Sequence, residues 1–332
     1  MTRSLTLTDA IADFVAHKRA LARKYEVETK TLALFARCLA AQEITEITAV
    51  TPPVIEAFLA SRPRTTPRSY NHLLGVLRVF FAWSVDFERC PTSPVRGRPR
   101  RTTRQRLPFI FDLSHAQQLV TAAATLPDGG HAVLRGTTYA TAFAVLYGVG
   151  LRVGELARLT CADLDLERQL FVIRETKFGK SRLVPVGPQL LQRVLAYRAQ
   201  REQAAGHPLT PEMPLFSLCS GRPVHPGTFS QTFHHLVTRL GFHHAENGVP
   251  PRLHDLRHSF AVGTLLRWYR TGDNPAAKLW YLSTFLGHVD LASTAVYLTI
   301  TPELLDAANA RYARLADPRA LAALRPSVED PA

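Results

Sequence analysis

The sequence predicts an α+β protein of two domains, mainly α-helical with one small antiparallel β-hairpin. Three observations support this prediction. Most of the 332 residues fall into segments whose apolar residues recur at helical spacing. One stretch, residues 164–187, instead alternates apolar and polar residues as β-strands do. A run rich in arginine and proline, residues 89–108, interrupts these patterns and separates two domains.

The composition is that of a folded protein with a strongly basic surface. Hydrophobic residues make up 46% of the chain and charged residues 20%. Lysine and arginine number 40 against 27 acidic residues, a formal net charge of +13. This excess favours nucleic acid as a partner first and an anionic membrane surface second. Only six of the cations are lysines, and arginine's planar guanidinium can bind two phosphate oxygens at once.

The cysteines and the N-terminus indicate a reduced, intracellular setting. The four cysteines are scattered without CxxC spacing, so we expect neither a disulfide framework nor a zinc knuckle. No secretory apolar core follows Met1, and no run approaches the ~18 apolar residues of a membrane span. We therefore expect a soluble, cytoplasmic protein.

The N-terminal domain, residues 1–88, is predicted to be a bundle of four short amphipathic helices. Thr8 is the expected N-cap of the first helix, which places Ile11, Phe14 and Leu21 on one face. Threonine-proline pairs mark the beginnings of the last two helices. The four predicted helical segments are 7–25, 26–42, 51–62 and 66–87.

The segment 89–108 has a composition that is typical of a linker. It holds seven arginines, four prolines, one glycine and no acidic residue, so it is predicted to be extended. Its charge density also suggests that it lies along a phosphate backbone. The arginines expected to contact that backbone are Arg96, Arg98, Arg100, Arg101 and Arg104.

The C-terminal domain is predicted over residues 109–315, followed by a tail at 316–332. It begins with a buried helix, a break marked by glycine, and a helix that carries Arg152 and Glu155. The alternating stretch then forms strands with a turn around Lys177 and Lys180. Helical segments follow at 188–202, 225–241, 254–270, 279–288, 291–301 and 302–317.

The stretch HDLRH places His254 and His258 four residues apart, on one face of a predicted helix. Two such histidines resemble the zinc-protease pattern H-E-x-x-H. However, Asp255 is one methylene shorter than the glutamate of that pattern, and the guanidinium of Arg257 would repel a dication. These objections weaken a zinc hydrolase as an interpretation but leave it open.

The same residues suit another chemistry, the breaking of a DNA phosphodiester without a metal. Such a reaction needs cations that neutralise a pentavalent phosphorane, a nucleophile, and an acid that protonates the departing oxygen. Two arginines suit the first task, a tyrosine the second, and a lysine or histidine the third. The C-terminal domain contains candidates for each.

Five motifs of the C-terminal domain, taken in order, resemble the signature series of the tyrosine recombinase (phage integrase) family. His288 lies nine residues before Tyr297, which is the family's spacing. The N-terminal bundle resembles the family's core-binding domain. The resemblance implies a two-domain, C-shaped clamp around double-stranded DNA, associated with the nucleoid. The five motifs are GVGLRVGEL around Arg152, RETKFGKSRLVPV, HDLRH, FLGH at 285–288 and STAVYLT at 293–299.

The resemblance also implies the roles of the main site residues. Arg152 and Arg257 would bind the non-bridging oxygens of the scissile phosphate. His254 would act there as a proton acceptor or hydrogen-bond donor, and His288 would hydrogen-bond the same phosphate. Tyr297 would be the nucleophile, and the cations around it should lower its pKa from the usual value of about 10. Neither a cofactor nor a metal is expected.

Four further residues receive less defined roles. Lys177 lies where the family keeps the lysine that protonates the 5′-oxygen, and Lys180 is a rival for that task or a backbone-phosphate contact. Glu155 would orient the start of its helix or pair with an arginine. We assign His258 a packing role only.

Three functions remain open at this point, and the zinc hydrolase is a fourth. The first is a site-specific recombinase that forms a 3′-phosphotyrosyl intermediate. It would work as a tetramer that exchanges its C-terminal helices in trans. A paralogue or a DNA-bending protein is a further possible partner. The segment 270–278 resembles a lengthened loop, which favours a mobile-element integrase or transposase over a housekeeping chromosome-dimer resolvase. The alternatives are relaxation of DNA like a type IB topoisomerase, and a non-catalytic DNA-binding regulator on the same fold.

Overall fold

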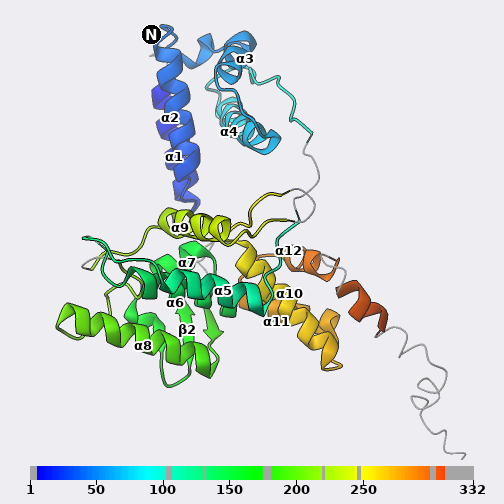
Figure 1. Cartoon of the computed structure of the whole chain (residues 1–332). Helices are drawn as coiled ribbons and strands as arrows, with labels where there is room; N and C mark the ends of the chain where they lie inside the picture. The colour runs from blue at the N-terminus through cyan, green and yellow to red at the C-terminus, as the bar shows by residue number, and fades with distance from the viewer. Residues whose placement is uncertain are drawn as a thin grey trace, which may run out of the picture. The chain divides into compact units, whose positions relative to one another are not determined.

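The computed structural model consists of two compact units, Met1–Arg106 and Leu107–Ala332 (Figure 1). None of the described helices is long and apolar enough to cross a bilayer. The structure describes residues 6–101, 107–130, 132–174, 181–218, 221–244, 248–299 and 304–310.

The N-terminal unit contains the four predicted helices. Aromatic side chains dominate its core, where Phe35 packs edge-to-face on Phe58 and on Phe81. Phe14 makes a similar contact with Phe80. The helices are α1 (Leu7–Ala20), α2 (Glu26–Ala40), α3 (Pro52–Ala60) and α4 (Pro67–Asp86).

The N-cap of the first helix lies two residues earlier than predicted. Its N-cap is Thr6 rather than Thr8, since the Thr6 side chain accepts a hydrogen bond of 3.1 Å from the Asp9 amide. The helix ends at Ala20, so Leu21 lies beyond it and is 57% exposed. The prediction that Leu21 shares the buried face is therefore wrong.

The arginine-rich segment has no helix or strand over residues 93–101, as predicted, but it is not detached from the N-terminal unit. Arg78 of α4 donates a hydrogen bond to the carbonyl of Gly97. Asn71 Oδ1 accepts the Arg100 amide at 2.7 Å, and the Arg100 guanidinium lies 4.0 Å from the centre of the Tyr70 ring. Polar contacts with α4 thus anchor a segment that buries little apolar surface. Arg96, Arg98, Arg100 and Arg101 are exposed, whereas Arg104 lies outside the described residues.

The C-terminal unit confirms the predicted fold class, since it is mostly helical with one small antiparallel sheet. The sheet has the order β1 (Leu164–Asp165), β2 (Leu170–Ile173) and β3 (Arg182–Pro185). In its register Leu170 pairs with Pro185 and Ile173 with Arg182. The helices are α5 (Leu113–Ala124), which the sequence analysis does not predict, α6 (Arg135–Val149), α7 (Val153–Arg158), α8 (Pro188–Ala205), α9 (Pro226–Arg239), α10 (Asp255–Arg270), α11 (Pro275–Leu286), α12 (Ala292–Ala295) and the 3₁₀ helix η4 (Val296–Thr299).

Two apolar clusters position the site residues. Helix α6 is buried on most of its sides, because α5, α8 and α10 all pack on it (Figure 1). A second cluster joins α10, α11 and η4, and it includes the buried side chains of Leu265, Leu282, Tyr297 and Leu304. The segment that carries Tyr297 is therefore held against α10 by apolar packing.

The lengthened loop predicted at 270–278 is mostly helix. Helix α10 continues to Arg270, and α11 begins at Pro275 with Asn274 as its N-cap. An ion pair of 2.6 Å between Asp273 and Lys278 closes the short turn between the two helices. The turn between the two helices thus spans only residues 271–274.

Gly150, between α6 and α7, offers a test of this packing. It has a φ of +61°, and an added Cβ would lie 2.6 Å from Phe260 Cδ1. We expect Gly150→Ala to lower the free energy of unfolding by about 2–4 kcal/mol. Gly263→Ala is the matched control, because its Cβ would meet nothing within 4 Å inside α10, and it should raise stability by up to about 1 kcal/mol. Denaturant titration measures both, and equal effects would contradict this account.

Candidate active site

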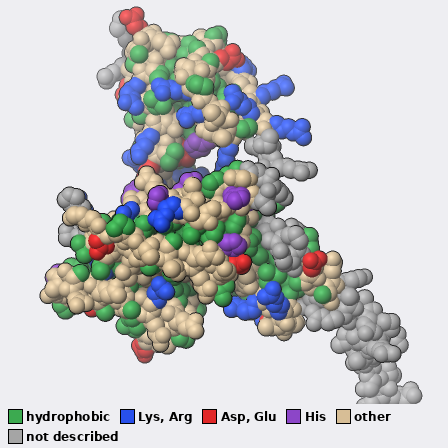
Figure 2. All heavy atoms as spheres, in the orientation of Figure 1, with side chains coloured by type: hydrophobic (Ala, Val, Ile, Leu, Met, Phe, Trp, Pro, Cys, Tyr) green, Lys and Arg blue, Asp and Glu red, His purple; other side chains and the backbone are tan. Residues whose placement is uncertain are grey.

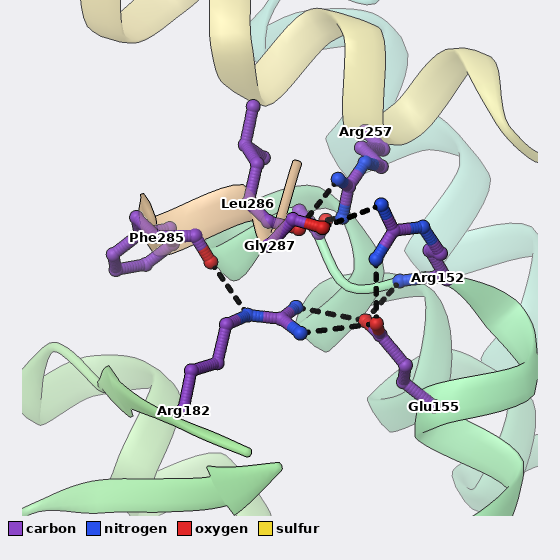
Figure 3. Close-up of polar contacts among 8 residues, drawn as sticks. Arg152, Glu155, Arg182, Arg257, Phe285, Leu286 and Gly287 are labelled. Atoms are coloured by element: carbon purple, nitrogen blue, oxygen red, sulfur yellow. Dashed lines mark hydrogen bonds and ion pairs between the residues drawn. The ribbon is translucent and has the colours of Figure 1, made fainter. Parts of the chain in front are cut away.

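Arg152 and Glu155 stabilise the start of α7 together. Arg152 is the N-cap residue, and Glu155 Oε2 accepts its backbone N–H at 3.0 Å. Glu155 Oε1 accepts a second hydrogen bond of 2.8 Å from Arg152 Nη1. Arg152 Nη2 donates to the carbonyl of Gly287 at 2.9 Å (Figure 3). Glu155 therefore both orients the helix start and pairs with an arginine, the two roles that the sequence suggested.

Arg182 of β3 is a member of this network that the sequence analysis does not identify. Its Nη1 and Nη2 donate to the two carboxylate oxygens of Glu155 at 3.0 and 2.8 Å. Its Nε donates to the carbonyl of Phe285 at 2.8 Å, so Arg182 links the sheet to the end of α11 (Figure 3). The sequence offers one signal that could have identified Arg182, the alternation of side chains along a strand. Arg182 lies two residues before the buried Val184 and thus on the same face of β3.

The electrostatics of Glu155 follow from these contacts. Burial by itself would raise the pKa of its carboxyl group. The hydrogen bonds and charge of Arg182, together with those of Arg152, instead lower that pKa to about 2. Glu155 is therefore ionised at neutral pH and compensates part of the positive charge of the site.

Arg257 of α10 is almost fully buried, with 1% of its surface exposed. Its Nη1 donates to the Gly150 carbonyl at 2.8 Å and its Nη2 to the Leu286 carbonyl at 2.6 Å. Among the residues that the structure describes, its buried Nε has no hydrogen-bond partner. Figure 3 shows the guanidinium groups of Arg152 and Arg257 next to each other at Gly287. Burial and the charge of Arg152 lower the pKa of Arg257 to about 9, so it still carries its charge at neutral pH.

Tyr297 lies on η4 with its ring buried, at 2% exposure. Its hydroxyl is 2.9 Å from His258 Nδ1, and its ring stacks on that of His288 with centroids 6.3 Å apart. Burial raises the pKa of Tyr297, while the charges of Arg257 and Arg152 oppose this shift. The prediction that the cations lower this pKa below its usual value is therefore wrong for the protein without DNA, because desolvation outweighs them.

The imidazoles of His258 and His288 contact this tyrosine, and that of His254 contacts His258. The rings of His254 and His258 meet edge-to-face with centroids 4.7 Å apart. His288 Nδ1 lies 2.6 Å from Thr294 Oγ1. Desolvation is the largest cause that lowers the pKa of each of these histidines, and the charge of Arg257 lowers all three further. The pKa is about 3 for His254, about 4 for His258 and about 4 for His288. All three rings are thus neutral at pH 7.

The structure brings together six of the eight predicted catalytic and supporting residues. Lys177 and Lys180 lie outside the described residues. His258 joins the six through its contact with Tyr297, so the prediction that it has a packing role alone is wrong. In the described parts of the chain no three His, Cys, Asp or Glu side chains form a group that could hold a metal ion. The six residues are Arg152, Glu155, His254, Arg257, His288 and Tyr297.

This arrangement suits an anionic group that is attacked by an oxygen nucleophile. Two adjacent guanidinium groups can stabilise charge on phosphate oxygens, and neutral imidazoles can donate or accept a proton beside the phenol. Residues 111–303, more than half of the chain, match the profile of the phage integrase family. The chain belongs to this family. It is a tyrosine-type DNA recombinase/integrase, an enzyme that breaks and rejoins DNA strands.

Two relatives of known family are similar to this chain along almost its whole length. It is 34% identical to the "Putative integrase/recombinase y4rB" of Sinorhizobium fredii over 313 residues, which cover 93% of this integrase and 98% of that protein. It is 30% identical to the "Tyrosine recombinase XerC" of Xanthomonas campestris over 319 residues, covering 92% and 89% of the two chains.

Solved structures show that the fold is shared at lower sequence identity. The integrase of the Tn1549 transposon in complex with a circular intermediate DNA is 19% identical, with a TM-score of 0.64 and coverage of 94% of this chain and 100% of that one. A lambda integrase dimer bound to a COC′ core site is 18% identical, with a TM-score of 0.58 and coverage of 89% and 77%.

Proposed function

We propose that this integrase recombines DNA at specific sites through a 3′-phosphotyrosyl intermediate on Tyr297. The observation that carries the proposal is the position of one buried phenol against two neutral imidazoles, with two arginines and a third imidazole in the same cluster. The unpaired Nε of Arg257 supports it, since a phosphate oxygen would supply the partner that a buried N–H requires.

In the proposed reaction the Tyr297 oxygen attacks the phosphorus and the bond from phosphorus to the 5′-oxygen breaks. Arg152 and Arg257 stabilise the charge that develops on the non-bridging oxygens. His254 and His288 hydrogen-bond the same phosphate. Lys177 protonates the 5′-oxygen, with Lys180 as the alternative donor. The new ester conserves the energy of the phosphodiester, so a 5′-hydroxyl can reverse the step and rejoin a strand.

The two units would close around double-stranded DNA as a C-shaped clamp, the N-terminal one as core-binding domain and the C-terminal one as catalytic domain. Figure 2 shows Lys and Arg side chains over the visible face of the N-terminal unit. Arg96, Arg98, Arg100 and Arg101 are exposed and so available to the DNA backbone, and Arg104 would extend this set. Phosphate contact would then provide most of the affinity and make it sensitive to salt.

Arg98 tests this backbone contact. Arg98→Gln should weaken DNA binding about equally on different sequences and reduce the slope of log K against log salt by about 0.9, because one counterion fewer is released. Arg193→Gln, on the exposed surface of α8, is the matched control and should leave the slope unchanged. Fluorescence anisotropy over a salt series measures both, and identical slopes would remove Arg98 from the interface.

We further propose that the enzyme integrates, excises or transposes a mobile element. The transposon integrase with a similar fold supports this assignment. Four protomers would assemble on two sites and exchange their C-terminal helices in trans, with a paralogue or a DNA-bending protein as further partner. The DNA substrate would place the enzyme in the cytoplasm, at the nucleoid.

The test begins with a pool of nicked duplexes of random sequence, incubated in EDTA. Covalent adducts are recovered and sequenced, which defines the cleaved site. A plasmid with two copies of that site then separates the alternatives. Deletion between the sites would support recombination, whereas relaxation without deletion would indicate a topoisomerase-like enzyme. Salt-sensitive binding without any adduct would indicate a regulator and overturn the proposal.

A further inference from the structure

The contact between His258 and Tyr297 points to a role for His258 that the family resemblance did not imply for this residue. Resting on the proposed function, we propose that His258 is a catalytic residue that receives the phenolic proton of Tyr297 on Nδ1 during strand cleavage. His258 Nδ1 lies 2.9 Å from the Tyr297 hydroxyl, already within the distance that proton transfer requires.

The geometry distinguishes His258 from the other two imidazoles. His288 directs its Nδ1 to Thr294 at 2.6 Å, and its ring stacks on the Tyr297 ring with 18° between the planes. A stacked ring presents its face rather than its nitrogen lone pairs to its neighbour. His254 meets the ring of His258 edge-to-face, at the open start of α10, where it is more than one-third exposed. His254 and His288 therefore remain suited to the phosphate, and His258 to the nucleophile.

The local fold fixes this contact. His258 lies one residue after Arg257 on α10, so the residue that binds the phosphate and the residue that binds the phenol share one turn of helix. On the other side, Tyr297 and Leu304 pack against Leu265 and Leu282 in one apolar cluster. Both partners of the hydrogen bond are thus held by packing that does not depend on the bond itself.

The proton balance of the step is complete. As the Tyr297 oxygen bonds to phosphorus, its proton moves to His258 Nδ1 and forms an imidazolium. The bond from phosphorus to the 5′-oxygen breaks, and that oxygen takes a proton from Lys177. On rejoining, the 5′-hydroxyl attacks and gives its proton back to Lys177, Tyr297 leaves as a phenolate, and His258 returns the proton to it.

The charges around His258 act in both directions. Asp255, three residues earlier on α10, favours the imidazolium, whereas Arg252 and Arg257 disfavour it. Desolvation is the largest effect, and with a pKa of about 4 the ring is neutral at pH 7, so one of its nitrogens can accept a proton. The remaining titratable groups that face the ring are His254 and Tyr297. A bound phosphate would add negative charge beside the cations and stabilise the imidazolium as it forms.

The test compares His258→Asn with the wild type in single-turnover cleavage of the selected nicked duplex. The Asn side chain keeps a hydrogen-bond acceptor near the position of Nδ1 but does not take up a proton at these pH values. We expect the rate at pH 7 to fall about 10²–10³-fold with DNA binding unchanged. We also expect the variant's rate to rise about tenfold per pH unit as hydroxide replaces the imidazole, while the wild-type rate stays level between about pH 6 and 8.

Each outcome decides the matter. His207→Asn, exposed beyond the end of α8, is the matched control and should cleave at the wild-type rate. Thermal unfolding of His258→Asn establishes that the variant is folded. A wild-type rate and pH profile in that variant, or a uniform loss of rate with no change in profile, would overturn proton transfer by His258 and leave the proposed function intact. If the wild type itself formed no adduct, both proposals would fail.

Discussion

Tyr297→Phe is expected to reduce covalent adduct formation by about 10³-fold or more while leaving DNA affinity unchanged. The substitution removes the one oxygen that we propose attacks the phosphorus, and the residual activity of enzymes without their nucleophile is of this low order. The measurement is the fraction of labelled nicked duplex that migrates with protein under denaturing conditions in EDTA.

Tyr281→Phe is the matched control, because this tyrosine lies on α11 in the same unit and is 72% exposed. It should form adduct at the wild-type rate. Tyr297→Phe should also fold normally, since the buried ring is kept and the hydrogen bonds of the hydroxyl, to His258 and Arg257, are worth about 1 kcal/mol each. Adduct surviving in Tyr297→Phe would move the nucleophile to another residue.

The second large effect is expected from Glu155→Gln, which should lower the free energy of unfolding by about 3–5 kcal/mol. The Glu155 side chain is only 3% exposed and accepts hydrogen bonds from both Arg152 and Arg182. A neutral amide would leave two cations without their counter-charge in a largely buried site, and such uncompensated charges are costly. Cleavage should fall as well, because Arg152 loses the contact that orients it.

The pKa of Glu155 makes this effect depend on pH. The folded-state pKa is about 2 against an ordinary value of 4.5. The ionised form therefore stabilises the fold above about pH 5, and this contribution is lost as pH falls toward about 2. The shift corresponds to roughly 2–4 kcal/mol in the wild type.

Urea titrations from pH 7 to pH 3 measure this dependence. Part of the wild-type loss of stability toward low pH should be absent from Glu155→Gln. Glu167→Gln, at an exposed position between β1 and β2 in the same unit, should follow the wild-type curve. Parallel curves for the wild type and Glu155→Gln would show that this carboxyl group does not contribute.

The sequence predicted most helices, because the signals for helices are local. The site residues came from the resemblance of five motifs to a known family, and the structure brings six of the eight together. The contacts that the sequence missed join distant segments. Arg182 reaches Glu155 and Phe285 from a strand, and spacing within β3 indicates only that it shares a face with Val184.

Two errors have the same origin. Cations near Tyr297 were expected to control its pKa, but burial by α10 and α11 has the larger effect, and burial depends on tertiary packing. The spacing of the sequence predicts the helix face on which His258 lies, and so a packing role. It does not predict that Tyr297, 39 residues further along the chain, contacts this face. Composition alone also did not reveal that Asn71 and Tyr70 hold the arginine-rich segment at Arg100.

The most direct test of the central claim is to identify the amino acid that carries the DNA. The adduct from the nicked duplex is digested with trypsin and nuclease and analysed by tandem mass spectrometry. The account predicts a peptide that contains Tyr297 with a nucleotide attached through its 3′-phosphate, and a free 5′-hydroxyl on the released strand. A nucleotide on any other residue, or one linked through a 5′-phosphate, would contradict it.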